Sequence, residues 1–374
     1  MPKNYHLKNY DFFLILFAAA ISIYGIIVIG SAKESVQSRQ VIGLVIGLVV
    51  MVILSLIDYR SILNFYWIYY VASIILLLSV RFLGVTRGGA KRWIILAGIQ
   101  FQPSETAKFL LILFFANFIM IHRDKVSRFG TLILTMGLFL IPWYLVYDEP
   151  DLSTSIVLIC IFLSMIFIAG LSWKIIIGTL AVAIPVLVIG LMLVLQPNQE
   201  IIKDYQQTRI LAWLQPDKYS NEEGYQQQNS IVAIGSGQLT GKGYKNNEVG
   251  SVKNGNFISE PQTDFIFAII GEELGFIGSA AVIILASLVV VETLRIGRNA
   301  SELSGTLICA GVAAHIGFQT FLNIAVATGV MPNTGIPLPF VSYGMTSLIS
   351  LFMEVGVVLN VGLLRLRERD NVRF

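Results

Sequence analysis

Apolar runs long enough to cross a lipid bilayer recur along almost the whole chain. A transmembrane helix needs about 20 mostly apolar residues to span the hydrocarbon core of a membrane. The segments that meet this requirement cover residues 11–31, 40–57, 65–83, 105–121, 130–147, 152–170, 174–195, 264–291, 306–328 and 338–364. The pattern predicts an all-α polytopic membrane protein with ten transmembrane helices, formed by residues 1–374 as a single domain.

One long polar region interrupts this pattern between the seventh and the eighth predicted helices. Residues 196–263 are rich in Gly, Asn, Gln and Tyr. A loop of this length is usually either functional or disordered. It contains the apolar run SIVAIGSG at residues 230–237, which indicates a segment that packs back on the membrane surface. We therefore expect a functional extracellular loop.

Composition agrees with a membrane protein and excludes several other classes. Hydrophobic residues make up 55% of the 374 residues and charged residues only 13%, against about 25% in a typical soluble domain. The net charge of +3 is too small to indicate a nucleic-acid partner. Cys160 and Cys309 lie in apolar runs, which argues against a disulfide framework, and no His or Cys cluster has the spacing of metal ligands.

Both termini are expected on the cytoplasmic side of the cell membrane. The first apolar run lacks a small-residue cleavage site after a short core, so we interpret it as a retained span rather than a signal peptide. An even number of spans puts both termini on one side, and the basic tail RLRERDNVRF favours the cytoplasm. Basic residues that violate this arrangement concentrate in VTRGGAKRWIILAGIQFQPSETAK, residues 85–108, which indicates another role for them.

Asp264 lies where the long polar loop meets the eighth apolar segment, in FISEPQTDFIFAIIGEELG. Small residues would follow it within about 40° on one helix face: Ala268, Gly271, Gly275 and Gly278. One interpretation is a helix cap above closely packed helices. The other is a catalytic base above a crevice that takes a lipid tail. For the deeper acids Glu272 and Glu273 we favour a structural ion pair or a protonated acid.

Basic residues also gather around the start of the fourth span. Pro103 and Glu105 have the pattern of a helix start, and Glu105 and Lys108 share a helix face at i, i+3. A local salt bridge that supports the helix end is one interpretation. The other is that Lys91, Arg92 and Lys108 neutralise an anionic headgroup at the outer surface, because phosphates attract Arg and Lys.

Three acids stand close together in YDEPDLSTS, residues 147–155. Such a group binds a cation through oxygen ligands or simply solvates a tight turn. We favour the turn for Asp148 and Glu149 and leave the role of Asp151 open.

Prolines and glycines interrupt the last apolar region in MPNTGIPLPFVSYGMTS, residues 331–347. Non-helical backbone at membrane depth is tolerated only where protein buries it or where it lines a cavity. His315, alone on its apolar helix, is interpreted as a satisfied packing residue. The residues thus indicate an outward-facing polar cavity suited to a phosphate-bearing amphiphile, in an enzyme or in a transporter.

Several motifs, taken in order, resemble those of the SEDS family (shape, elongation, division and sporulation), which includes RodA and FtsW. They are GGAKRWI, FQPSETAK, EPDLSTS, GYQQQNSIVAIGSGQLTGKG, EPQTDFIFAIIGEELG and TGIPLPFVSYG. The resemblance covers essentially the whole chain, and the short N-terminus and MPNTGIPLPFVSYG are more similar to RodA. Two departures are mild: Asn229 precedes Ser230, and Met345-Thr346 follows Gly344 where members usually have Gly-Ser.

The resemblance implies a peptidoglycan glycosyltransferase for cell elongation and shape. Such an enzyme polymerises lipid II, an undecaprenyl-pyrophosphate disaccharide-peptide, outside the membrane and works with a class B penicillin-binding protein. The family's essential acid corresponds to Asp264. Other family residues near the cavity correspond to Arg92, Glu105, Lys108, Asp151 and, by the start of the second span, Arg39.

The implied reaction assigns Asp264 the role of general base on the 4-hydroxyl of the acceptor sugar. A solvated position would leave this carboxylate ionised. Lys91, Arg92 and Lys108, or a bound divalent cation such as Mg²⁺ or Mn²⁺, would stabilise charge on the pyrophosphate leaving group. No other cofactor is expected. A lipid II flippase and a non-catalytic scaffold for the penicillin-binding protein are the alternatives.

Overall fold

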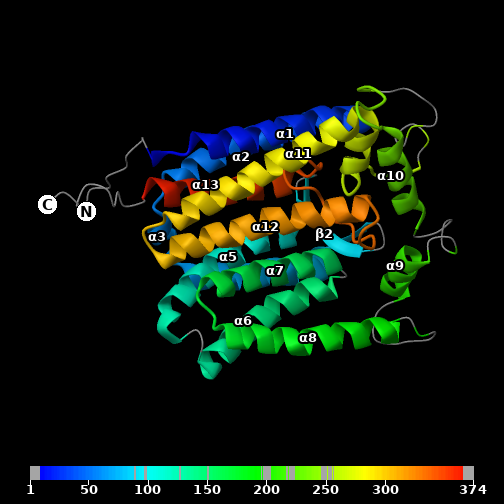
Figure 1. Cartoon of the computed structure of the whole chain (residues 1–374). Helices are drawn as coiled ribbons and strands as arrows, with labels where there is room; N and C mark the ends of the chain where they lie inside the picture. The colour runs from blue at the N-terminus through cyan, green and yellow to red at the C-terminus, as the bar shows by residue number, and fades with distance from the viewer. Residues whose placement is uncertain are drawn as a thin grey trace.

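The structure is a computed structural model that describes residues 9–87, 90–96, 99–125, 128–149, 151–194, 196, 204–215, 218, 224–245, 251, 255 and 257–364. Helices dominate it (Figure 1). The helices are α1 (Phe12–Ala32), α2 (Glu34–Ser55), α3 (Tyr59–Leu63), α4 (Tyr66–Leu83), α5 (Pro103–Ile121), α6 (Phe129–Asp148), α7 (Leu152–Ile168), α8 (Trp173–Val194), α9 (Asp204–Leu214), α10 (Tyr225–Ser236), α11 (Ile266–Arg298), α12 (Leu303–Ala327) and α13 (Met345–Leu363). The strands are β1 (Val85–Arg87), β2 (Ala90–Leu96) and β3 (Ile99–Phe101).

Each of the ten predicted spans overlaps a helix, although residues 338–344 of the last span are non-helical. Eight of them are helices of at least 18 residues that are apolar enough to cross a membrane: α1, α2, α4, α5, α6, α11, α12 and α13. The other two predicted spans fall on the 17-residue apolar helix α7 and on the 22-residue helix α8. The chain is therefore an all-α polytopic membrane protein, as its hydrophobic pattern predicts.

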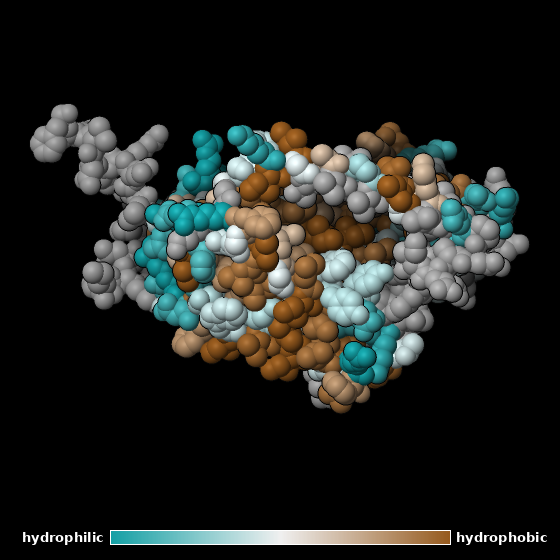
Figure 2. Space-filling model, turned by 90° about the horizontal axis from the view of Figure 1, so that it is seen from below, coloured by the Kyte–Doolittle hydropathy of each residue, from teal (hydrophilic) through white to brown (hydrophobic). Residues whose placement is uncertain are grey.

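The first and last described segments lie at the same end of the helical bundle (Figure 1). A Cβ atom added to Gly362 would lie 3.8 Å from the carbonyl oxygen of Asn9. The opposite end carries β2, α9 and α10, and we call it the loop end. On the face drawn in Figure 2, hydrophobic residues fill the middle of the bundle and hydrophilic residues gather towards its two ends. This distribution is the one expected of a protein that spans a bilayer.

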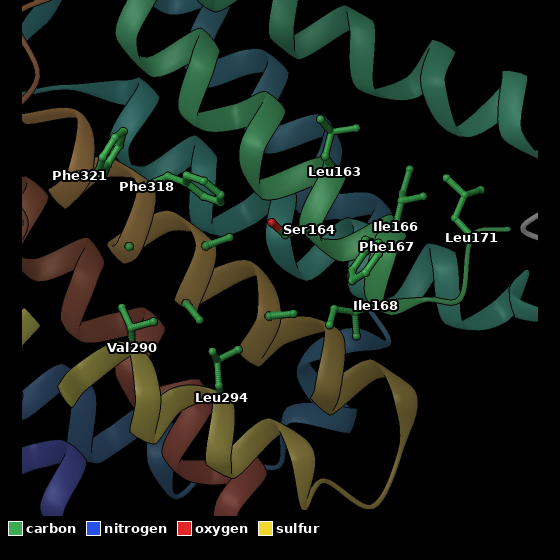
Figure 3. A pocket seen from close by; sticks show the side chains of 14 residues that line it. Leu163, Ser164, Ile166, Phe167, Ile168, Leu171, Val290, Leu294, Phe318 and Phe321 are labelled. Atoms are coloured by element: carbon green, nitrogen blue, oxygen red, sulfur yellow. The ribbon is translucent and has the colours of Figure 1, made fainter. Parts of the chain in front are cut away.

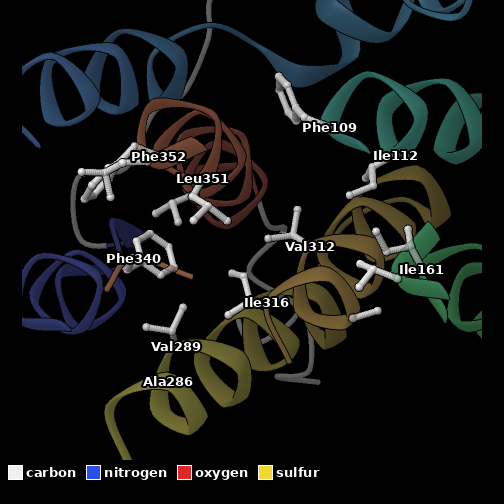
Figure 4. Close-up of a cluster of buried hydrophobic side chains, with 14 of the residues drawn as sticks. Phe109, Ile112, Ile161, Ala286, Val289, Val312, Ile316, Phe340, Leu351 and Phe352 are labelled. Atoms are coloured by element: carbon white, nitrogen blue, oxygen red, sulfur yellow. The ribbon is translucent and has the colours of Figure 1, made fainter. Parts of the chain in front are cut away.

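Three helices form the centre of the bundle. In each of α5, α12 and α13, 78% of the apolar window is buried, whereas only 22% is buried in α4 and in α6. Figure 4 shows apolar side chains from these central helices meeting one another, among them Ile112, Ile316 and Leu351. Polar side chains on these three helices are therefore surrounded by low-dielectric material, where every missing hydrogen bond is costly.

The small β-sheet is an element that the sequence analysis does not predict. Its three strands are antiparallel in the order β1–β2–β3. Strand β2 pairs with β1 through Thr86 and Lys91, and with β3 through Ile95 and Gln100. Successive residues of a strand point to opposite faces, so Lys91 and Arg92 are separated by the strand itself. In the sequence, Gly88-Gly89 separates the residues of β1 from those of β2, and a Gly-Gly pair between two strands is typical of a β-hairpin.

Helix α10 packs back on the membrane-spanning helices, as the run SIVAIGSG predicts. Ser230 Oγ donates to the carbonyl of Ala327 at 2.7 Å, and Gln227 Nε2 donates to the carbonyl of Val326 at 2.8 Å. A Cβ atom on Gly271 would lie 2.8 Å from the side chain of Ile234. The small-residue face of α11 is thus covered by protein, so the interpretation as a lipid-tail crevice is wrong and close packing is confirmed.

Helix α11 is broken at Gly275, whose φ of 63° belongs to the left-handed region that favours glycine. The loop after α10 supplies the missing backbone bonds: Phe276 N donates to the carbonyl of Gln238 at 2.8 Å. The same loop pairs Lys242 Nζ with Glu272 at 3.0 Å. On the other side, Ser31 Oγ donates to Glu273 at 2.6 Å. Both deep acids are therefore held by the fold, and the predicted ion pair is present for Glu272.

A hollow of about 790 Å³ lies between α7, α11 and α12 (Figure 3). Its lining is almost wholly apolar, with Leu163, Phe167, Leu294 and Phe318 around it and Ser164 as its one side-chain hydroxyl. Chemistry on a charged headgroup needs ionisable groups, and none line this hollow. The candidate site is therefore elsewhere.

Candidate active site

The predicted break between α12 and α13 is a non-helical segment, residues 331–344. It binds the residues that immediately precede Asp264. Ser342 Oγ donates to the carbonyl of Thr263 at 2.6 Å. Tyr343 N donates to the carbonyl of Gln262 at 2.9 Å. The segment is largely buried, which satisfies the requirement for irregular backbone inside a membrane protein. The segment therefore holds in place the residues that precede α11 at the loop end.

Asp264 lies in a turn just before α11, and the cap interpretation is wrong. The helix begins at Ile266, its N-cap is Phe265, and no described side chain caps it. Instead, Asn323 on α12 positions the Asp264 backbone. The Asn323 Nδ2 group donates to the carbonyl of Asp264 at 2.8 Å and to the carbonyl of Ile336 at 2.7 Å. One amide group thus joins the turn to the non-helical segment.

The Asp264 carboxyl is half-buried rather than solvated, contrary to the expectation from the sequence. Burial raises the pKa of Asp264 above its usual range. The cations Arg92 and Arg209 oppose this rise in pKa, and the nearby Asp151 adds to it. A carboxyl whose pKa is raised in this way is a stronger base when ionised than an exposed aspartate.

Arg92 and Asp151 form a second part of the same cluster. The Arg92 Nη1 atom lies 3.5 Å from Asp151 Oδ1, and these side chains are 14% and 1% exposed. Asp151 is the N-cap of α7, where its Oδ1 accepts from Thr154 N at 3.1 Å. A Cβ atom on Gly335 would lie 3.2 Å from Asp264 Oδ2 and 4.0 Å from Arg92 Nη2. Arg92, Asp151 and Asp264 therefore surround the same turn of the non-helical segment.

Arg209 is the residue of this cluster that the sequence analysis missed. It lies on α9, inside the long loop, and acts electrostatically on Asp264. Trp213 fixes α9 to the bundle, because its Nε1 group donates to the carbonyl of Gly329 at 2.9 Å. Nothing local marks Arg209 in the sequence, since a basic residue in a polar loop is ordinary. Its role follows from where α9 packs.

The other predicted site residues are more scattered. Glu105 and Lys108 are 1% and 0% exposed and form an ion pair at 2.7 Å, which confirms their shared helix face. Lys108 reaches no surface in this arrangement. Lys91 is half-buried and donates to the carbonyl of Arg81 at 2.7 Å. Arg39 is exposed on α2 beside Gln40, whose Nε2 group donates to the carbonyl of Ser342 at 3.1 Å.

Glu149 is a buried acid at the edge of this cluster. Among the described residues, neither of its carboxyl oxygens has a hydrogen-bond partner. Burial raises the pKa of Glu149 to about 9, with Asp151 and Asp148 also raising it and Arg92 lowering it. This side chain is therefore protonated at neutral pH. The expectation of a solvated turn is wrong for Glu149, whose side chain is buried close to Asp151 and Arg92, although Asp148 is exposed.

Glu149→Gln is expected to stabilise the protein at neutral and alkaline pH. In the folded state the raised pKa keeps the proton, whereas the unfolded carboxyl ionises, so wild-type stability falls as pH rises from about 4.5 towards about 9. Glutamine does not titrate, so the difference in melting temperature between Glu149→Gln and wild type should grow by several degrees over this range. Thermal unfolding in detergent at several pH values measures it, with Asp124→Asn as an exposed control. A pH-independent difference would contradict the assignment.

The described part of the chain contains no group of three or more His, Cys, Asp or Glu residues placed to hold a metal ion. The cluster contains two guanidinium groups and two ionisable aspartates near one turn. Guanidinium groups bind phosphate oxygens through paired hydrogen bonds. The arrangement therefore supports recognition of an anionic headgroup together with proton transfer to Asp264.

The fold and the cluster define a class: a multi-pass membrane protein with a buried charged site at the loop end of its bundle. Comparisons with known proteins identify the family. The family model described as "Cell cycle protein", which covers FtsW, RodA and SpoVE, matches residues 7–365. The chain belongs to this family, the SEDS family, and is a peptidoglycan glycosyltransferase of the RodA/FtsW type.

Relatives of both types are similar to the chain over nearly its full length. Peptidoglycan glycosyltransferase MrdB of Escherichia coli (strain K12) is 34% identical over 358 residues, which cover 93% of this chain and 92% of the relative. The probable peptidoglycan glycosyltransferase FtsW of Geobacter sulfurreducens is 32% identical over 375 residues, 95% of each protein.

Two solved structures share the fold. One, described as "Structural coordination of polymerization and crosslinking by a peptidoglycan synthase complex", matches with a TM-score of 0.77 and 29% identity, over 94% of this chain and 97% of that chain. The crystal structure of the Thermus thermophilus rod shape determining protein RodA matches with a TM-score of 0.70 and 28% identity, over 96% and 98%.

Proposed function

We propose that the chain polymerises lipid II into glycan strands at the outer face of the cytoplasmic membrane, with both termini in the cytoplasm. The observation that carries this proposal is the placement of Arg92 and Arg209 around the half-buried Asp264. A pyrophosphate-linked sugar offers an anionic group for the two cations and a hydroxyl for the carboxylate. The position of this cluster at the loop end, away from the described chain ends, supports the outer location.

In the proposed reaction, Asp264 accepts the proton of the acceptor sugar's 4-hydroxyl as its oxygen attacks C1 of the donor sugar. The bond from C1 to the pyrophosphate oxygen breaks, and polyprenyl pyrophosphate leaves with the bonding electrons. General-base catalysis of this kind contributes about 10²–10⁴-fold. Arg92 and Arg209 stabilise the charge that develops on the leaving group. The pyrophosphate is a good leaving group, so the reaction needs no general acid.

The other predicted residues take supporting roles in this proposal. Asp151 holds the Arg92 guanidinium. The buried ion pair of Glu105 with Lys108 supports the structure beneath the site. Lys91 and Arg39, which are less buried, are available to outer parts of the headgroup.

A role in cell elongation and shape is the more specific proposal. It rests on the RodA-like motif MPNTGIPLPFVSYG and on similarity to MrdB and to the rod shape determining protein RodA. Depletion of the protein in its host distinguishes the roles. Rod-shaped cells that become round support elongation, whereas filaments that fail to divide would assign the protein to division.

A class B penicillin-binding protein is the proposed partner. One matching structure is described as a complex that coordinates polymerization and crosslinking, and this supports the same kind of assembly for the chain. Co-purification of a candidate class B protein with the full chain from membranes tests the proposal. Failure of every such protein of the host to co-purify would contradict it.

The assay that tests the activity is polymerisation of purified lipid II by the detergent-solubilised chain, alone and with the partner. Glycan strands on a gel support the glycosyltransferase. Absence of strands in the presence of the partner would favour a lipid II flippase or a scaffold, and transfer of labelled lipid II across liposomes then separates these two. The pairing of Glu272 with Lys242 and of Glu273 with Ser31 of α1 favours the enzyme, because a transporter needs intramembrane charges that change partners.

A further inference from the structure

A chain of buried polar side chains runs through the centre of the bundle beneath the proposed site. His315 on α12 meets Glu354 on α13, with Nδ1 at 2.9 Å from both carboxyl oxygens. The His315 Nε2 atom lies 2.9 Å from Gln319 Oε1, and Lys108 Nζ donates to the same oxygen at 2.6 Å. Lys108 in turn binds Glu105. All five side chains are buried, and three of them, His315, Gln319 and Glu354, have no role in the proposed reaction.

Apolar side chains from the same three helices surround this polar chain. Figure 4 shows Phe109 and Ile112 of α5, Ile316 of α12, and Leu351 and Phe352 of α13 in the same core. In such surroundings a buried polar group without a partner is strongly disfavoured, so the members of the chain fix one another's orientation.

The orientation of Gln319 determines where the protons lie. Its Nε2 group donates to the carbonyl of Pro337 at 3.1 Å, so its Oε1 faces Lys108 and His315. An ammonium group only donates, and an amide oxygen only accepts. The His315 Nε2 atom must therefore carry a hydrogen. A second proton is then shared between His315 Nδ1 and Glu354, so the pair is neutral in sum whichever atom holds it.

The polar face of α12 connects this pair to the proposed site. His315, Gln319 and Asn323 follow one another at intervals of four residues, which places them on one helix face. Gln319 binds the carbonyl of Pro337. Asn323 binds the carbonyls of both Ile336 and Asp264. The helix thus holds two successive residues of the non-helical segment beside the Asp264 turn.

We infer that His315 and Glu354 are positioning residues for the reaction at Asp264, acting through Gln319 and the non-helical segment. This inference rests on the proposed function of that site. Glu354 locks the His315 ring, the ring directs the Gln319 oxygen, and the Gln319 amide fixes Pro337. Loss of either member of the pair releases a segment whose Gly335 lies beside Asp264 and Arg92.

Matched variants test the inference with purified full-length protein. His315→Leu and Glu354→Leu should each lower kcat for lipid II polymerisation by about 10-fold to 100-fold with KM little changed, because a misplacement of about 1 Å can cost about 100-fold. Glu354→Gln should remain near wild type, since its amide hydrogen can bond to Nδ1 of a neutral ring. Thr320→Val is the control: its buried hydroxyl on α12 has no hydrogen-bond partner in the part of the chain that the structure describes, and activity should be unchanged.

Hydrogen–deuterium exchange of peptides covering residues 331–344 provides a readout that does not depend on activity. Exchange should be faster in His315→Leu and Glu354→Leu than in wild type, Glu354→Gln and Thr320→Val. Should His315→Leu not purify as a folded protein, His315→Asn takes its place, because its amide can replace Nδ1 towards Glu354 but is too short to reach Gln319. Unchanged exchange, or a wild-type kcat in the Leu variants, would overturn the inference. If the wild-type protein itself were inactive, the proposed function would be rejected. The exchange measurement would then decide whether His315 and Glu354 position the segment.

Discussion

Asp264→Asn is expected to abolish the formation of glycan strands from lipid II by the purified protein. Asparagine keeps the shape of the side chain but cannot accept a proton at neutral pH, so the rate should fall by about 10²–10⁴-fold. The measurement is initial polymerisation rate in detergent with the partner present. Asp124→Asn, on a side chain that is 90% exposed, is the matched control and should behave as wild type.

Stability distinguishes a lost base from a lost fold. Burial raises the pKa of Asp264, so the ionised carboxylate is less favourable in the folded protein than in the unfolded chain. This contribution to stability is present at low pH and is lost as pH rises through the raised pKa. Asp264→Asn should therefore melt no lower than wild type at neutral pH. A variant that is folded and fully active would show that another group is the base.

The same shift in pKa predicts the pH dependence of the wild-type rate. The base must be ionised, so kcat/KM should fall as pH drops through the pKa of Asp264. Because that pKa is raised, the fall should begin at a higher pH than for an exposed aspartate. A rate that stays constant to pH values near the usual aspartate pKa would contradict the half-buried position of the carboxylate.

Arg92→Gln is expected to produce the second large loss, about 10²–10³-fold in kcat, because one preorganised donor to the leaving group is removed. Arg92 also lowers the pKa of Asp264, so its loss should move the acidic limb of the rate profile to higher pH. The buried Asp151 would lose its cation, and the melting temperature should fall as well. Polymerisation assays over a range of pH, combined with thermal unfolding, measure all three effects.

Two further variants isolate the role of the Arg92 charge. Arg92→Lys retains the charge but not the paired donors, so it should recover part of the rate and leave the acidic limb closer to wild type. Arg81→Gln removes an exposed arginine at the end of α4 and should have little effect. If Arg92→Gln lowered stability but left kcat and the pH profile unchanged, Arg92 would be only a structural partner of Asp151.

The spans and the non-helical segment could be predicted from the order of residues alone. Each of the ten segments had to be long and apolar, because a bilayer cannot solvate unpaired backbone groups. The prolines and glycines of residues 331–344 had to interrupt a helix for the same local reason. The pairing of Glu105 with Lys108 was also predictable, since both lie on one helix turn.

Predictions failed where they depended on partners from distant parts of the chain. The small-residue face of α11 was open to two interpretations until α10 was seen to cover Gly271 through Ile234. His315 was expected to be a satisfied packing residue, but its partner could not be named, because Glu354 lies 39 residues later on another helix. Glu149 was expected to be solvated, yet its side chain is buried close to Arg92, more than 50 residues away in the sequence.

Hydrophobicity and backbone preference belong to each residue and its near neighbours, so the order of residues already contains the membrane class, the positions of the helices and the motifs of the family. The charge, burial and pKa of the site residues do not follow from near neighbours in this way. Arg209 meets Asp264 because α9 folds over the loop end, and the pKa of Asp264 is raised because protein replaces water around it. Charge, burial and hydrogen bonding depend on groups brought together from separate helices, and the packing of those helices is what sets them.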